Sequence, residues 1–158
     1  MDFSRMEEVR AGWSGDRKYH AWDDGGQEFF LRLSQPEKWE KAQSAFALQE
    51  KAFQLGLPVS EPIELAQEEG QVRFVARWLS GQMAEDALPA LPQGGQYRLG
   101  WEAGEVLRAL HTIPAPAEAE DWESRFNRKI ERKIQLYRER SFQYENGEAF
   151  IRYMEENR

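Results

Sequence analysis

The stretch Glu28-Phe29-Phe30-Leu31-Arg32-Leu33 decides the fold, because it is an almost unbroken apolar strand that encloses a single charge. It follows Asp23-Asp24-Gly25-Gly26, a strong signal for a tight hairpin turn. The residues before that turn, 17–22, include Tyr19 and Trp22, whose aromatic rings suit a strand. We therefore expect two antiparallel strands joined by a short turn.

A helix is expected directly after the apolar strand. Pro36 and Glu37 suit its first turn, and Gly56 followed by Pro58 marks its end. Between them, residues recur at spacings of three and four, as on one face of a helix. These residues are Trp39, Ala42, Phe46, Gln49 and Phe53.

Three further apolar segments, separated by turn residues, complete the first half of the chain. The sequence thus predicts five antiparallel strands with one helix after the third; the strands are 5–11, 17–22, 28–33, 63–66 and 72–78. The second half is helical in pattern, with helices at 95–111, at 119–138 and from 147 onward. We expect an α+β fold with a strand lobe at 1–79, a linker at 80–93 and a helical part at 94–158.

Composition excludes several classes of protein. The chain has 158 residues and a net charge of −7, with 21 Lys and Arg against 28 Asp and Glu, so no nucleic-acid partner is expected. It has no cysteine, which excludes disulfides and thiolate metal sites. No apolar run approaches the ~20 residues that span a bilayer, and the N-terminus lacks the pattern of a signal peptide. We therefore expect no membrane partner and a cytoplasmic location.

Two features indicate a binding site in the strand lobe. The turn Gly12-Trp13-Ser14-Gly15-Asp16 could cover a ligand, although an ordinary hairpin loop has the same composition. Arg32 is a lone charge in an apolar strand, and a buried guanidinium is unfavourable without an anionic partner such as phosphate. The alternative is an edge-strand arginine whose head reaches water.

Five motifs follow one another along the chain: residues 12–19 with 30–34, Leu55-Gly56-Leu57-Pro58-Val59, Arg77-Trp78-Leu79-Ser80-Gly81, Leu107-Arg108-Ala109-Leu110-His111 and Asp121-Trp122-Glu123-Ser124-Arg125-Phe126-Asn127. Together and in this order they resemble a known family, the aminoglycoside phosphotransferase and choline-kinase-like enzymes, which are protein-kinase-like. The resemblance runs from about residue 5 to the end of the chain.

This resemblance implies a protein-kinase-like N-lobe, made of a five-stranded antiparallel sheet plus one helix, and then the first helices of a helical C-lobe. It assigns the site residues as follows. Ser14, Gly15 and Asp16 would lie over the triphosphate, and Arg32 would contact phosphate. The Arg77 carbonyl and the Leu79 amide would bind adenine, and Phe30 and Ile63 would form walls of the adenine slot.

The sequence departs from the family at two points. The glutamate that usually pairs with the phosphate-binding cation falls at Ala45 or close to it. The family's catalytic loop, H-G-D-x-x-x-x-N, does not occur, since neither His20 nor His111 is followed by Gly-Asp. We therefore expect no catalytic residue in this chain, and the chain is interpreted as a truncated, inactive portion of an enzyme.

The resemblance also implies ligands and partners. The full-length enzyme would use ATP and Mg²⁺, with the Mg²⁺ ligands outside this chain. It would phosphorylate an aminoglycoside or another small-molecule alcohol, and such an activity would confer antibiotic resistance. The alternative is a non-catalytic module that binds a nucleotide or a protein. A role for Trp13 or Trp22 in stacking on carbohydrate is a minor alternative.

The C-terminal helices carry apolar stripes that can cover each other only in part. Such exposed apolar surface favours association. The sequence therefore predicts a homo-oligomer formed through these helices; the alternative is that the last helices are poorly ordered. The stripes are Leu99, Val106, Leu107 and Leu110, then Phe126, Ile130 and Ile134, then Phe150, Ile151 and Met154.

Overall fold

The computed structural model describes residues 1–12 and 14–157. The chain divides into two compact units, Met1–Pro114 and Ala115–Arg158, and each unit is described here by itself. Trp13, one of the two tryptophans considered for carbohydrate stacking, lies outside the described residues.

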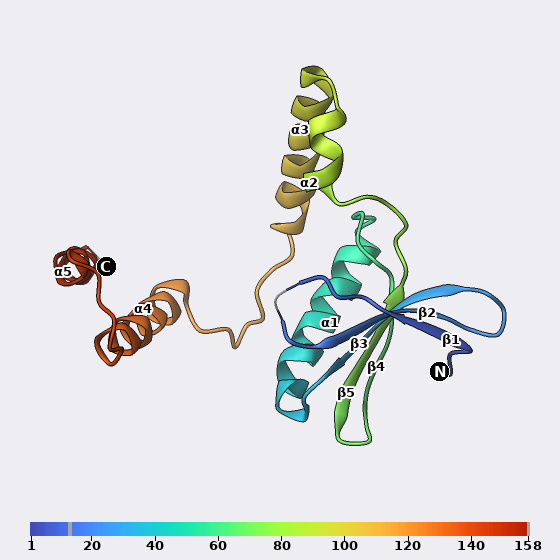
Figure 1. The fold of residues 1–158 in the computed structure, drawn as a ribbon, viewed down its shortest axis with the longest axis horizontal. Coiled ribbons are helices and arrows are strands. Elements are labelled where there is room, and N and C mark those ends of the chain that lie inside the picture. Colours follow the sequence, from blue (N-terminus) through green and yellow to red (C-terminus); the bar gives the residue numbers. More distant parts are fainter. Residues whose placement is uncertain (13, 158) are drawn as a thin grey trace. The chain divides into compact units, whose positions relative to one another are not determined.

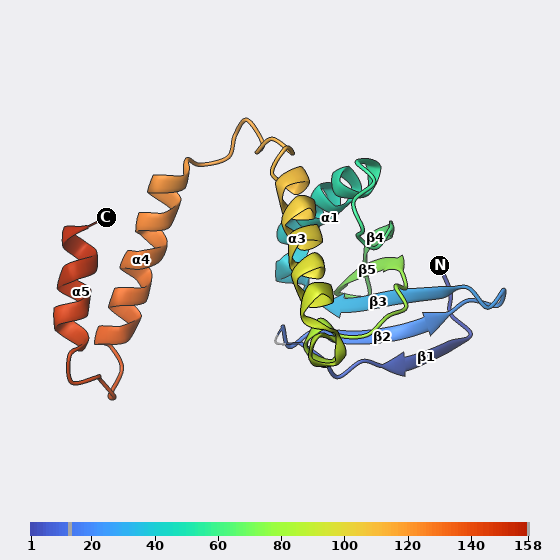
Figure 2. The ribbon, with the colours of Figure 1, turned by 90° about the horizontal axis from the view of Figure 1, so that it is seen from above.

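The first unit contains a five-stranded antiparallel sheet with strand order β1-β2-β3-β5-β4. Figure 2 shows β1, β2 and β3 side by side in this order. The predicted five antiparallel strands with one helix after the third are confirmed. The strands are β1 (Arg5–Glu8), β2 (Arg17–Trp22), β3 (Glu28–Ser34), β4 (Pro62–Glu68) and β5 (Gln71–Arg77).

Helix α1 (Trp39–Gln54) follows β3 through a short 3-10 turn, η1 (Pro36–Lys38). It packs against β4 and β5 (Figure 1). Gly56 adopts a φ of 73°, and the Leu57 amide donates to the Ala52 carbonyl over 3.1 Å, which closes the helix in the manner of a Schellman motif. The predicted glycine stop is therefore used, because a residue with a Cβ is disfavoured at this left-handed position.

The two faces of the sheet carry different sets of apolar side chains. One face carries the buried cluster Ala21, Phe29, Leu31 and Val75, with Phe3, Tyr19, Leu33 and Ile63 packed around it. Side chains alternate along a strand, so Phe30 and Arg32 of β3 lie on the opposite face. There Phe74 meets Phe30 and also Phe46 of α1, at ring-centroid distances of 6.3 and 6.0 Å.

The segment predicted as a linker contains two short helical elements, α2 (Ala84–Ala87) and η2 (Leu88–Ala90). Helix α3 (Gln93–Leu110) follows, and none of its residues is buried. Among the described residues, no helix is long and apolar enough to cross a bilayer.

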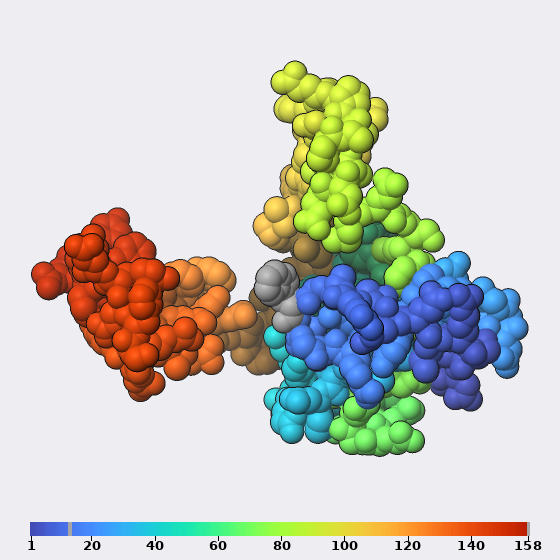
Figure 3. Space-filling model, in the orientation of Figure 1, coloured from blue at the N-terminus to red at the C-terminus, as the bar shows by residue number. Residues whose placement is uncertain are grey.

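The second unit is a helical hairpin of α4 (Trp122–Arg138) and α5 (Gly147–Glu156). Helix α4 begins three residues later than predicted, because the Asp121 carboxylate accepts a hydrogen bond from the Ser124 amide (3.0 Å) and caps the helix at that point. Ile134 and Ile151 are the buried residues of these two helices. In the space-filling view the orange atoms of α4 and the red atoms of α5 form one packed body (Figure 3).

Candidate functional site

A cavity of about 410 Å³ lies on the sheet face that carries Phe30 and Phe74. Its size falls in the range of small-molecule sites. Strands β3 and β5, helix α1 and the segment after β5 all contribute to it, so it forms where several elements converge. The lining residues are Val9, Phe30, Arg32, Gln49, Ser60, Phe74, Ala76, Arg77, Trp78 and Leu79.

The structure brings four of the sequence-predicted site residues together in this cavity: Phe30, Arg32, Arg77 and Leu79. They come from two places, the middle of β3 and the end of β5 with the residues beyond it. Antiparallel pairing of β3 and β5 brings these two places together, because Phe30 of β3 lies directly opposite Ala76 of β5. The small Ala76 side chain leaves room between them for a ligand.

Arg32 supplies a charge to the cavity without a protein anion beside it. Its Nε atom is buried and has no hydrogen-bond partner among the described residues. Its guanidinium carbon lies 4.9 Å from the centre of the Phe74 ring, and its cross-strand neighbour on β2 is Lys18. Buried donors are nearly always satisfied, so the free Nε–H marks a place for an acceptor.

Helix α1 contributes an amide side chain one turn beyond the position where the family resemblance expects a carboxylate. Ala45, the position expected for that group, is exposed. Gln49, one turn further along the helix, lines the cavity with Arg32 and donates from Nε2 to the Ser60 carbonyl over 2.7 Å. No carboxylate pairs with Arg32 in the part of the chain that the structure describes.

The segment after β5 forms one wall of the cavity, and its backbone is held at two points. The Arg77 amide donates to the Glu61 carbonyl (2.8 Å), and the Trp78 amide donates to the Glu28 carbonyl (3.1 Å). The next amide, that of Leu79, has no partner among the described residues. We call residues 77–79 the hinge; its Leu79 N–H is a free donor, whereas the Arg77 carbonyl already accepts from the Ser60 hydroxyl.

The glycine-containing loop, described at residues 12 and 14–16, is held just before it by one lysine and at its end by another. Lys18 donates to the Ala11 carbonyl over 2.9 Å. Lys38, at the end of η1, bonds the Asp16 carboxylate over 2.6 Å and reaches the Ser14 carbonyl at 3.5 Å. Gly12 and Gly15 have φ values of 92° and 68°, which favour glycine at both positions.

The Asp16 carboxylate is held inside this loop, with its side chain only 8% exposed. Burial alone would raise its pKa. Hydrogen bonds from Lys38, Ser14 and Ser34, together with the charge of Lys38, outweigh burial and lower the pKa below its usual value. Asp16 is therefore an ionised anchor of the loop.

The remaining sequence-predicted residues lie apart from the cavity. Ser14, Gly15 and Asp16 do not line it. Ile63 packs against the buried cluster on the other face of the sheet and lines a separate hollow beside α1. The sequence analysis did not single out Lys18 or Lys38. For Lys18 a signal was available, because it pairs with Arg32 across the hairpin of β2 and β3 and therefore lies on the same face of the sheet.

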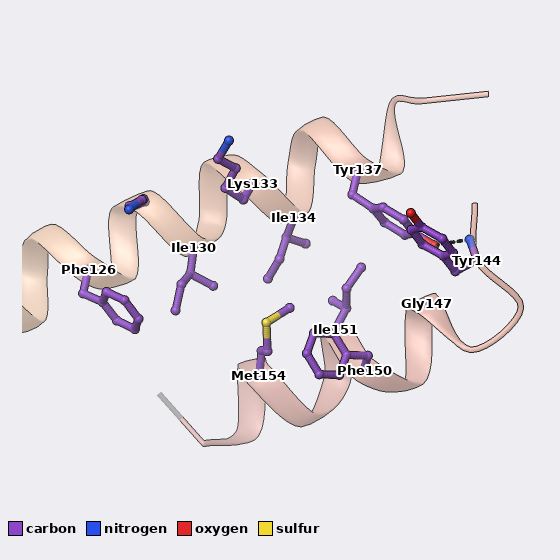
Figure 4. Close-up of a pocket in the computed structure, with 11 residues that line it drawn as sticks. Phe126, Ile130, Lys133, Ile134, Tyr137, Tyr144, Gly147, Phe150, Ile151 and Met154 are labelled. Carbon is purple, nitrogen blue, oxygen red and sulfur yellow. Dashed lines mark hydrogen bonds between the residues drawn. The ribbon is translucent and has the colours of Figure 1, made fainter. Parts of the chain in front are cut away.

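A second hollow of about 420 Å³ lies between α4 and α5 of the helical hairpin. Figure 4 shows Ile130, Ile134, Ile151 and Met154 pointing into it. The Tyr144 amide donates to the Tyr137 hydroxyl at its end over 2.8 Å. The lining is aliphatic and aromatic apart from Lys129 and Lys133, so it provides an apolar surface.

Among the described residues no group of three or more His, Asp or Glu side chains is placed to hold a metal ion.

Trp22, the other tryptophan considered for carbohydrate stacking, contacts His20 and lies under the Arg5 guanidinium, 4.5 Å from the ring centre. Protein groups therefore already cover part of its ring.

Comparisons with known proteins show a solved structure of similar fold and the family of this chain. One solved structure, described as the crystal structure of aminoglycoside-3'-phosphotransferase of type VIII, is 18% identical in sequence and has a TM-score of 0.59. The match covers 97% of this chain and 58% of that protein, so the chain spans a little over half of its length. No curated protein matches the sequence. The model of the family described as "Phosphotransferase enzyme family" matches residues 5–157, and the chain therefore belongs to this family of phosphotransferases.

Proposed function

We propose that this chain forms the ATP-binding portion of a kinase that transfers the γ-phosphoryl group of ATP to a hydroxyl of a small molecule. The observation that carries the proposal is that one cavity is lined by Arg32, whose buried Nε has no partner, and by Leu79, whose amide has none among the described residues. A nucleotide has groups suited to both, because phosphate oxygens accept from guanidinium and a purine nitrogen accepts from an amide.

The cavity walls support adenine rather than a sugar as the buried group. Phe30 and Phe74 supply flat apolar surface, and Ala76 between them and the hinge leaves space for a ring. Arg32, two residues along β3 from Phe30, would then meet the phosphates. The glycine-containing loop at residues 12–16 would close over them, with its backbone amides as donors.

Aminoglycosides are the leading substrate class, because the solved relative of similar fold is named as an aminoglycoside 3'-phosphotransferase. Other small alcohols fit the same chemistry. Mg²⁺, when bound, would neutralise charge on the phosphates. We propose that carboxylates outside this chain hold it, since no group of three or more His, Asp or Glu side chains among the described residues is placed to hold a metal ion. The family's catalytic loop sequence does not occur, so we propose that the 158-residue chain alone binds ATP without transferring phosphate.

Titration of the purified chain with ATP, followed calorimetrically, tests the proposal. Arg32→Ala should weaken ATP binding roughly tenfold or more, because charge-assisted hydrogen bonds are lost. Arg17→Ala is the matched control: Arg17 lies on the same sheet, bonds Gln71 and pairs with Leu33, on the face opposite the cavity. A folded parent chain that does not bind ATP would overturn the proposal.

The second candidate is a non-catalytic module that binds a protein partner. The apolar hollow between α4 and α5 favours it. ATP binding with loss on Arg32→Ala, measured as above, separates the two, because a pure interaction module has no reason to retain a nucleotide site.

A further inference from the structure

The ring of His20 packs against the rings of two tryptophans, one of which belongs to the hinge. Its centroid is 3.7 Å from that of Trp78, with the planes 7° apart, and 3.9 Å from that of Trp22, with the planes 31° apart. The side chain of His20 is 18% exposed. A nearly parallel contact of this closeness restricts how Trp78 can rotate.

Glu28 joins the same two residues by a second route. Its carboxylate Oε2 lies 2.6 Å from Nε2 of His20, and its backbone carbonyl accepts from the Trp78 amide over 3.1 Å. His20 is on β2, Glu28 begins β3 and Trp78 follows β5, so three strands are linked through one histidine. The contacts form a closed ring of three residues, in which the orientation of each depends on the other two.

Trp78 is the middle residue of the hinge and lines the cavity, between Arg77 and Leu79. Its ring packs on His20 and its amide is bonded to the Glu28 carbonyl, so residue 78 is held through both its side chain and its backbone. The Leu79 N–H, which has no partner among the described residues, depends on the peptide unit that joins residues 78 and 79 for its direction. A side chain that packs on the Trp78 ring therefore helps to hold residue 78, to which the Leu79 amide is directly bonded.

We infer that His20 is a positioning residue for the nucleotide site. It holds Trp78 so that the Leu79 amide faces the bound purine ring. The inference rests on the proposed function. It also separates two parts of the site: His20 acts on the contacts to the purine ring, whereas Arg32 acts on the phosphates.

Binding of two ligands, ATP and adenosine, to the folded chain tests this separation. His20→Ala removes both the stacking and the bond to Glu28, and should weaken ATP and adenosine by the same factor, roughly three- to tenfold. Arg32→Ala should weaken ATP alone, because adenosine has no phosphate. His20→Phe keeps a flat ring against the tryptophans and should recover most of the affinity that His20→Ala loses.

His111→Ala is the matched control, since His111 lies at the end of α3 and outside the cavity. A second readout needs no ligand: amide hydrogen exchange at residues 77–79 should be faster in His20→Ala than in the parent and in His20→Phe. If the parent binds ATP and His20→Ala binds adenosine with unchanged affinity, the inference is overturned while the proposed function stands. If the folded parent binds neither ligand, both fail.

Discussion

The Nζ atom of Lys38 lies 2.6 Å from Oδ1 of Asp16, and this ion pair joins the glycine-containing loop to the start of the helix that follows β3. The same lysine reaches the Ser14 carbonyl, so one side chain holds the loop at two points. The loop that would cover a triphosphate is thus fixed at its Asp16 end.

Asp16→Asn should loosen the loop and lower the free energy of unfolding by roughly 0.5–1.5 kcal/mol, because a partly buried charge-assisted hydrogen bond is lost while Lys38 remains partly solvated. Urea denaturation at neutral pH measures the change. Glu37→Gln, an exposed carboxylate one residue from Lys38, is the control and should leave stability almost unchanged. Equal stability of Asp16→Asn and the parent would show that the ion pair contributes nothing.

The same pair predicts a pH dependence. The pKa of Asp16 is lowered in the folded chain from its usual value of 3.8. Its stabilising contribution is therefore complete above that value and is lost as pH falls below it, when the carboxylate becomes protonated in the folded state. Acid titration of stability should show a smaller decrease below pH 3.8 for Asp16→Asn than for the parent; identical acid profiles would contradict this.

Ala76→Leu should block the cavity. Ala76 has no solvent exposure and faces Phe30 across β3 and β5, so the larger side chain must extend into the space between them. We expect ATP affinity to fall at least tenfold, by filling of the site. Ala47→Leu on the exposed face of α1 is the size-matched control. Thermal unfolding must confirm that Ala76→Leu is folded; if it is folded and binds ATP like the parent, the purine lies elsewhere.

The order of strands and helices could be predicted from sequence because each signal was local. The apolar stretch around Phe30, the stop at Gly56 and the turn at residues 23–26 each fix one element without reference to the rest of the chain. The predicted start of α4 is too early, because the helix begins where the Asp121 side chain caps it with a hydrogen bond, and the spacing of apolar residues does not indicate such a bond.

The residues of β3 that line the candidate cavity could be predicted from the alternation of side chains along the strand. Phe30 and Arg32 share a face by alternation, and both line the cavity. Ile63 does not, because β4 has an irregular register between Pro62 and Glu64, and alternation cannot be counted through it. The roles of Lys38 and Gln49 depend on how η1 and α1 pack, which is a tertiary property.

The helical hairpin should self-associate, as its exposed aromatic residues suggest. Phe150 is 64% exposed on α5 beside the apolar hollow. We propose a second copy of the chain as the partner, because contiguous apolar surface of this kind is buried by association. Light scattering at micromolar concentration should show dimers or larger species, and Phe150→Glu should reduce them. Tyr97→Glu on α3, where the residue is 77% exposed, is the control. A parent chain that stays monomeric would refute the proposal.

The turn between α4 and α5 should not tolerate a side chain at Gly147. A Cβ atom there would lie 1.8 Å from the Tyr137 hydroxyl oxygen and 2.6 Å from the carbon that bears it. Tyr137 cannot simply move away, because its hydroxyl accepts the Tyr144 amide and its ring stacks on that of Tyr144. Gly147→Ala should therefore destabilise the hairpin by roughly 1–3 kcal/mol, as overpacking does elsewhere.

Amide hydrogen exchange of α4 and α5 measures this effect locally, independently of the first unit. Gly104→Ala is the control: Gly104 lies within α3, nothing is within 4 Å of its added Cβ, and alanine favours helix, so exchange in α3 should slow or stay the same. We expect faster exchange in α4 and α5 for Gly147→Ala. Adding Tyr137→Phe should restore slow exchange only in part, because it removes the hydroxyl but leaves the ring. Unchanged exchange in Gly147→Ala would mean that Tyr137 does not hold this turn.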